Sequence, residues 1–221
     1  PSLPSNADAL EAVVEAVRRA GYRPGEEVWV CLDVAASELY RNGLYHLPRE
    51  GRSFAPREMA TFLEGWSLRY PVLSIEDGMD QEDWEGWREL TQRVGQRVQV
   101  VGDDLYVTST RRLERGVREG ASNAVLIKPN QIGTLTETWE AVRLARQAGW
   151  GTVMSHRSGE TEDTTIADLA VGWATGQIKT GAPARSERVA KYNRLLRIEE
   201  ELGPQARYAG REPYRYLECR G

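Results

Sequence analysis

The chain has 221 residues, of which 40% are hydrophobic and 28% charged, and its formal net charge at pH 7 is -4. This length suffices for one well-packed domain and argues against two full domains. A nearly balanced charge without a long run of one sign argues against nucleic acid or a membrane surface as a general partner. No apolar stretch approaches the roughly 18 residues of a membrane span, and the first residues lack the parts of a signal peptide, so we expect a cytoplasmic protein.

The two cysteines, Cys31 and Cys219, lie far apart in the sequence and form no CxxC pair. This spacing predicts neither a disulfide framework nor a zinc site. We therefore expect Cys31 to be a small buried residue and Cys219 to be a residue of the tail.

The first predicted element is a helix that begins after Ser5 and ends at Gly21. Ser5 is a candidate N-cap, and apolar residues recur at helical spacing behind it. Six short apolar runs further along the chain are typical of strands that are covered on both faces. They occupy residues 28–32, 71–75, 98–102, 124–127, 151–155 and, with a weaker pattern, 176–178.

Helical segments alternate with these strands, among them residues 111–119, 134–147, 165–174 and 189–202. The interval after the first strand is longer, because residues 38–55 are rich in Tyr, Gly and Pro and indicate an inserted loop or hairpin. Strand and helix in alternation predict an α/β fold with a parallel sheet and right-handed crossovers.

Each of the six strands is followed by an ionisable residue. In chain order these are Asp33, Glu76, Asp103, Lys128, His156 and Lys179. This arrangement favours a (β/α)8-type barrel, in which the active site lies at the carboxyl ends of the strands. An open doubly wound sheet is the alternative, although its ligands gather at one switch point. Because the barrel needs eight strands and the sequence supplies about six, we expect it to be incomplete in this chain.

Asp33, Glu76 and Asp103, which we call the strand-end acids, should meet at one edge of the sheet. Three carboxylates in a confined site are costly unless a cation neutralises them. Oxygen ligands with open positions favour Mg²⁺. Asp104, beside Asp103, is expected to orient a lysine or a metal-bound water. The alternative is that these acids cap helices or lie in surface loops.

Lys128 and Lys179 end later strands and should face the same cation site, unless they are solvated loop residues. Near divalent cations one of them can act as a general base, while the other neutralises a carboxylate or a developing oxyanion. The segment His156-Arg157-Ser158 lies between a strand and a helix start, which suits a phosphate or carboxylate, with a capped helix as the alternative. His156 could form a hydrogen bond with substrate or with a neighbouring acid. Together these groups fit the abstraction of a proton α to a carboxylate.

Five segments of the chain resemble the signature segments of the enolases and occur in the same order. They are SIEDGMD at 74–80, GDDL at 102–105, LIKPNQIG at 126–133, SHRSGETED at 155–163 and QIKTG at 177–181. The resemblance extends from about Leu3 to the end of the helix at Leu202. The SIEDG segment and the RYAGR segment at 207–211 look more like bacterial members of the family.

The resemblance implies a lyase of glycolysis and gluconeogenesis, which catalyses the reversible dehydration of 2-phosphoglycerate to phosphoenolpyruvate with Mg²⁺. By position, the strand-end acids would hold the first magnesium and Lys128 would remove the C2 proton. Lys179 would contact the substrate carboxylate. Arg157 and Ser158 would bind the phosphate, with His156 near the substrate.

The resemblance also implies a homo-oligomer, either a dimer or an octamer. Residues 1–221 would form the C-terminal barrel portion, without the N-terminal α+β domain and the first two barrel strands of the family, so we expect the isolated chain to be inactive. The alternative is a non-catalytic enolase-like fragment that acts as a binding or scaffold protein, with a possible secondary location at the cell surface. A third possibility is an acid-sugar dehydratase or racemase of the wider superfamily, but the segment at 155–163 is foreign to those branches.

Overall fold

The structure is a computed structural model that describes residues 3–217. These residues form two compact units. Unit 1 comprises residues 3–105, 116–123 and 217, and unit 2 comprises residues 106–115 and 124–216.

Three parallel strands form the main sheet of unit 1, in the order β1-β5-β6. They are β1 (Val30–Asp33), β5 (Val72–Glu76) and β6 (Gln99–Gly102). All four residues of β6 are buried, as the continuous apolar run in its sequence predicts. The strands confirm the predicted runs to within two residues at either end.

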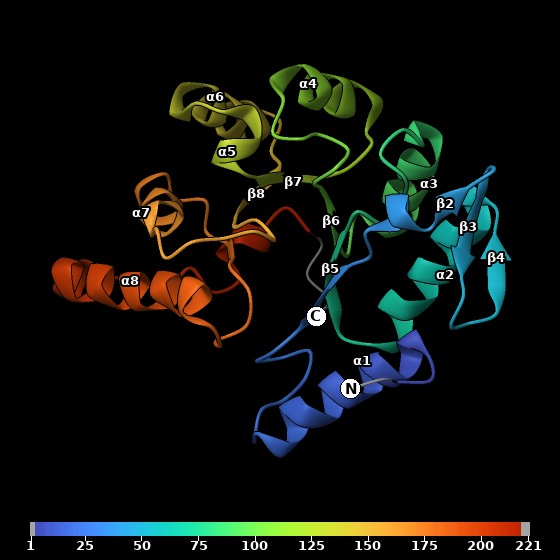
Figure 1. Cartoon of the computed structure of the whole chain (residues 1–221), viewed down its shortest axis with the longest axis horizontal. Coiled ribbons are helices and arrows are strands. Elements are labelled where there is room, and N and C mark those ends of the chain that lie inside the picture. The colour runs from blue at the N-terminus through green and yellow to red at the C-terminus, as the bar shows by residue number, and fades with distance from the viewer. Residues whose placement is uncertain (1–2, 218–221) are drawn as a thin grey trace. The chain divides into compact units, whose positions relative to one another are not determined.

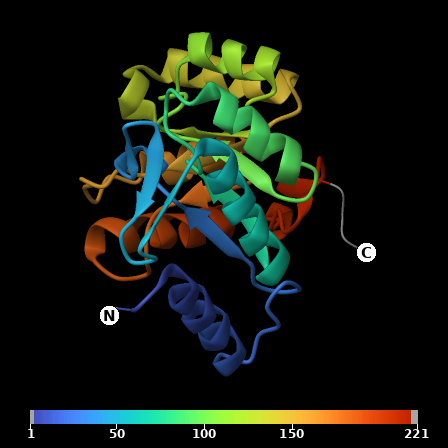
Figure 2. The same ribbon diagram turned by 90° about the vertical axis from the view of Figure 1, so that its right-hand side faces the viewer.

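The helices of unit 1 include α1 (Asn6–Arg19), α2 (Pro56–Arg69) and α3 (Trp84–Val94). Helix α1 begins with the predicted cap, because the Ser5 hydroxyl accepts a hydrogen bond from the Asp8 N–H while the Asp8 carboxylate accepts one from the Ser5 N–H. Figure 2 shows this helix, in dark blue, against strand β1.

The insertion after β1 is a small antiparallel sheet of three strands, where the sequence indicated a loop or hairpin. The strands are β2 (Tyr40–Arg41), β3 (Leu44–Leu47) and β4 (Arg52–Phe54), and the sheet lies beside α2 (Figure 1). A one-turn 3-10 helix, η1 (Ala36–Glu38), precedes it. The insertion is anchored by the buried Tyr45, whose hydroxyl donates to Asp83 Oδ2 at 2.7 Å and accepts the Asp80 N–H at 2.9 Å.

Unit 2 contains the parallel strands β7 (Ala124–Ile127), β8 (Gly151–Ser155) and β9 (Ile178–Lys179). Its helices include α5 (Pro129–Ile132), α6 (Leu135–Gln147), α7 (Thr165–Gly172) and α8 (Ser186–Leu202). Helix α4 (Thr110–Glu119) has its first residues in unit 2 and its last in unit 1. Two 3-10 turns, η2 (Gly203–Gln205) and η3 (Glu212–Tyr214), end the described chain.

The fold class predicted from the sequence is confirmed. The described residues supply six parallel strands of barrel type, separated by helices, as expected for an incomplete (β/α) barrel. Within residues 3–217 no helix combines the length and apolar character that crossing a membrane requires.

One sequence prediction about the core is wrong. Cys31 is a free, exposed thiol and is not buried. The reason is that β1 lines an open cavity of about 700 Å³ in unit 1, together with residues of α1 and α2. Cys219 lies outside the described residues.

Candidate functional site

The strand register of unit 1 places the strand-end acids at similar levels along three neighbouring strands. Asp33 is the partner of Glu76 across β1 and β5, and Glu76 is the partner of Val101 across β5 and β6. Asp103 lies two residues beyond Val101, at the exit of β6. Glu76 and Asp103 are only 7% and 8% exposed, whereas Asp33 is exposed. The three acids therefore come from the carboxyl ends of three adjacent strands, as the sequence predicted.

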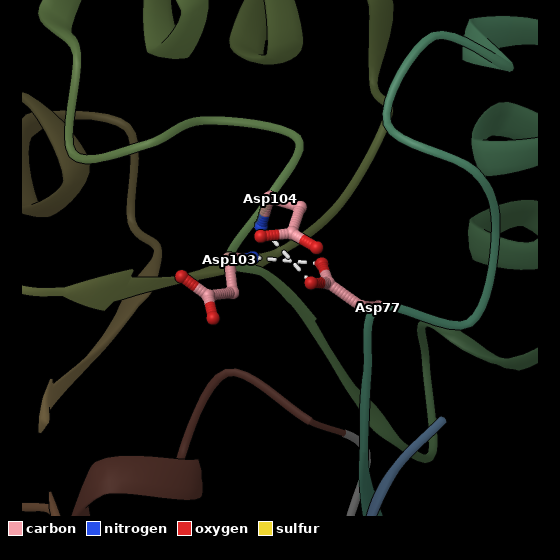
Figure 3. A group of neighbouring side chains, drawn as sticks. All are labelled: Asp77, Asp103 and Asp104. Carbon is pink, nitrogen blue, oxygen red and sulfur yellow. Dashed lines mark hydrogen bonds between the residues drawn. The ribbon is translucent and has the colours of Figure 1, made fainter. Parts of the chain in front are cut away.

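Asp77 links the ends of these strands, although no role was predicted for it from the sequence. Its carboxylate accepts the main-chain N–H groups of Asp103 and Asp104, both at 2.9 Å (Figure 3). Its own N–H donates to the Val101 carbonyl, and its carbonyl accepts the Ala36 N–H, both at 3.0 Å. Asp77 has a φ of +44°, a strained conformation of the kind that gathers at functional sites. One buried residue thus fixes the exits of β1, β5 and β6.

The acidic group with the shortest spacing is not the predicted triad. Among residues 3–217, Asp77, Asp103 and Asp104 are the ones whose ligand atoms all lie within 4.8 Å of one another. Figure 3 shows the Asp103 carboxylate pointing away from Asp77. Burial raises the pKa of Asp77 to about 8, and the charges of Asp103 and Asp104 contribute, against two main-chain hydrogen bonds that lower it. Of the three, Asp77 and Asp103 are buried. Carboxylate oxygens are ligands that fit a divalent cation such as Mg²⁺.

The main chain at Lys128 is held by a strained loop of unit 2. The Lys128 N–H donates to Thr108 Oγ1 at 3.0 Å, and that hydroxyl donates to Gln131 Oε1 at 3.1 Å. Thr108 is fully buried, and both Val107 and Thr108 have positive φ values, 45° and 57°. Two consecutive β-branched residues in this conformation are unusual and persist only when their surroundings fix them. The loop therefore positions the end of β7 where Lys128 emerges.

The structure brings two predicted residues of unit 2 together at the ends of β8 and β9. The His156 N–H donates to the Lys179 carbonyl at 2.9 Å. Arg157 Nη1 donates to Asn130 Oδ1 at 3.0 Å. This hydrogen bond connects the loop after β8 with α5, the helix that directly follows Lys128 in the chain. Ser158 follows on the surface and is exposed.

Arg188 of α8 holds the loop at residues 156–158, and the sequence analysis missed it. Its Nη1 lies 2.6 Å from His156 Nδ1 and donates to the Arg157 carbonyl at 2.8 Å, while its Nη2 donates to the Ser158 carbonyl at 2.9 Å. Arg188 is 8% exposed. No local motif marks it, since it lies 32 residues from His156 and only the fold brings the two together.

Lys191, one turn further along α8, holds the next part of the same loop. It is fully buried, donates to the Thr161 and Glu187 carbonyls, and lies 3.6 Å from Glu160. Although burial raises the pKa of Glu160, hydrogen bonds from the Thr161 and Arg157 N–H groups and the charge of Lys191 lower it overall. Glu160 is therefore a charged partner that ties the loop to α8.

The sequence predicted an anion site at a helix start, and the structure differs from this prediction in one respect. Helix α7 begins at Thr165, seven residues after Ser158, and the Thr165 N–H donates to Asp163 at 2.9 Å. Asp163 therefore occupies the Thr165 N–H and Glu160 occupies the Arg157 N–H, whereas the sequence predicted a helix start with open N–H groups.

The fold and these strand ends define a class: (β/α) barrel proteins whose functional side chains lie at the carboxyl ends of the strands. Residues 1–217 match the family described as "Enolase, C-terminal TIM barrel domain". The chain belongs to this family, which confirms the family predicted from the five sequence segments. The bacterial type and the individual residue roles stay predictions.

Proposed function

We propose that the protein is an enolase, which dehydrates 2-phosphoglycerate reversibly to phosphoenolpyruvate. One observation besides family membership carries the proposal. The chain has three lysines, Lys128, Lys179 and Lys191, and all its other basic side chains except the two histidines are arginine. Two of the three lie at strand ends, where a side chain that can lose its proton is useful and arginine is not.

In the proposed reaction Lys128 accepts the proton from C2 of the substrate, and Lys179 contacts the substrate carboxylate. The Thr108 hydroxyl supports this role, since it fixes the main chain from which Lys128 extends. Arg157 and Ser158 bind the phosphate, for which a guanidinium fork is well suited. His156 donates a hydrogen bond near the substrate.

The strand-end acids would hold the first Mg²⁺, and Asp104 would orient a group next to it. Magnesium bound there would neutralise the charge of the substrate carboxylate as it develops. The burial of Glu76 and Asp103, and the raised pKa of Asp77, support a site that needs a cation.

The finer parts of the proposal concern the whole protein. We propose that activity needs an N-terminal α+β domain and two further barrel strands, and that the complete protein is a cytoplasmic homo-oligomer, dimeric or octameric.

Exchange of the C2 proton of 2-phosphoglycerate in D2O tests the role of Lys128. The chain is first completed with the N-terminal portion of an enolase. We expect Lys128→Ala and Lys128→Arg to abolish exchange while Mg²⁺ binding, measured by calorimetry, is kept. Arginine retains the charge but cannot release its proton, so the pair separates base chemistry from charge. Exchange that survives in either variant would remove Lys128 from the base role.

A further inference from the structure

The contact between Arg188 and His156 bears on the protonation of the His156 ring as well as on the position of the loop. Arg188 Nη1 lies 2.6 Å from His156 Nδ1, and both side chains are at least half-buried. A guanidinium has only N–H donors and keeps its charge in proteins. His156 Nδ1 must therefore be the acceptor, which requires an imidazole without a proton on that nitrogen.

Arg188 has little freedom to turn away from this arrangement. The same Nη1 also donates to the Arg157 carbonyl and Nη2 to the Ser158 carbonyl, so three acceptors of one loop hold the guanidinium. Gly181 closes the other side with a φ of +84°. A Cβ at this position would lie 2.9 Å from Arg188 Cδ and 3.2 Å from His156 Cε1, so any residue other than glycine would crowd the pair.

Most charged groups around the ring also oppose its protonation. Besides Arg188 on α8, they are Lys179 on β9, Lys128 at the end of β7, and Glu160 in the loop. Burial, then Arg188 and the two lysines, lower the pKa of His156, whereas Glu160 alone acts in the opposite direction.

We propose that Arg188 is a positioning residue that holds His156 as the neutral imidazole with its single proton on Nε2. His156 is thereby a hydrogen-bond donor through Nε2 across the neutral pH range and does not serve as a proton acceptor through Nδ1. An anionic oxygen of phosphate or carboxylate type is the ligand that such a donor suits. The identity of that ligand rests on the proposed function, but the protonation state does not.

Nitrogen NMR of the chain labelled with ¹⁵N-histidine tests the proposal directly. The chain has two histidines, His46 and His156, so a His46→Gln variant assigns both. We expect a pyridine-like Nδ1 and a pyrrole-like Nε2 signal for His156, and a titration midpoint below that of a free imidazole. A His156 ring that mixes both tautomers, or that titrates like a free imidazole, would overturn the proposal. His46, held by Ser53 and Arg41, reports that the chain is folded.

Variants of α8 then test whether Arg188 is the cause. Arg188→Met should allow the His156 proton to occupy either ring nitrogen and should move the titration midpoint of His156 up towards that of free imidazole. Arg188→Lys should restore part of the preference for Nε2 and part of the lower midpoint. Arg194→Met is the matched control, since Arg194 lies on the same helix and pairs with Asp168 and Glu201. An unchanged His156 spectrum in Arg188→Met would contradict the role of Arg188. The NMR experiment uses no substrate, so its outcome is independent of the enolase assay. A negative NMR result would not contradict the proposed enolase activity, and an inactive enolase assay would not contradict the protonation state of His156.

Discussion

The free energy of unfolding should fall as the pH rises from about 4 to about 8 in the absence of divalent cations, because of Asp77. Asp77 is 3% exposed, and burial raises the pKa of its carboxyl from 3.8 to about 8. Between these values the folded chain keeps a proton that the unfolded chain has lost. Stability contributed by this group is therefore present at low pH and lost as the pH rises, by about 1.4 kcal/mol per pH unit.

Asp77→Asn is the comparison variant, since Asn also tolerates a positive φ but carries no titrating proton. Its amide can accept only one of the two main-chain N–H groups, and that loss is the same at both pH values. Urea unfolding at about pH 5.5 and about pH 7 should show the stability advantage of the wild type over the variant shrinking by roughly 2 kcal/mol. Added Mg²⁺ should weaken this pH dependence, because a cation favours the ionised carboxyl. Parallel pH profiles for the two proteins would show that Asp77 does not retain its proton in the folded chain.

Three further changes test contacts in unit 2, two of them around residues 156–161 and one at the loop that contains Thr108. Lys191→Met should lower the free energy of unfolding by about 3 kcal/mol in urea melts, because it leaves Glu160 and two carbonyls without their buried partner. Arg194→Met should lower it much less, because the ion pairs of Arg194 are open to solvent. Equal losses in the two variants would contradict this. Gly181→Ala should cost about 1 to 2 kcal/mol from its positive φ, and a thermal midpoint equal to wild type would show that the backbone relaxes. Thr108→Val keeps the shape of the side chain but removes the acceptor of the Lys128 N–H. Chemical denaturation should therefore show a free energy of unfolding lower by about 2 kcal/mol. An unchanged free energy of unfolding would mean that water replaces the hydroxyl.

The sequence predicted the framework well, because the framework depends on local patterns. Continuous apolar runs located the six strands to within two residues, and helix α6 begins and ends within one residue of the predicted 134–147. The strand ends followed directly, since each run stops at a polar residue. The small sheet β2-β3-β4 was less certain, because its short strands carry too few residues for a clear period.

Residues that act through the fold could not be predicted in this way. Asp77 stood in a signature segment, but its role depends on main-chain N–H groups 26 and 27 residues away. Arg188 and Lys191 look like ordinary helix residues at a three-residue spacing, and only the packing of α8 turns them towards residues 156–161. Cys31 was misjudged because an apolar neighbourhood in sequence does not reveal whether a strand face is covered.

An ultraviolet assay for phosphoenolpyruvate formed from 2-phosphoglycerate with Mg²⁺ tests directly whether the protein is an enolase. The purified chain is assayed alone and with the N-terminal portion of an enolase added. We expect no turnover from the chain alone and turnover when the N-terminal portion is added, and we expect Lys128→Ala to abolish that turnover. No turnover from a folded, complete assembly would contradict an enolase and favour a binding or scaffold role for this barrel.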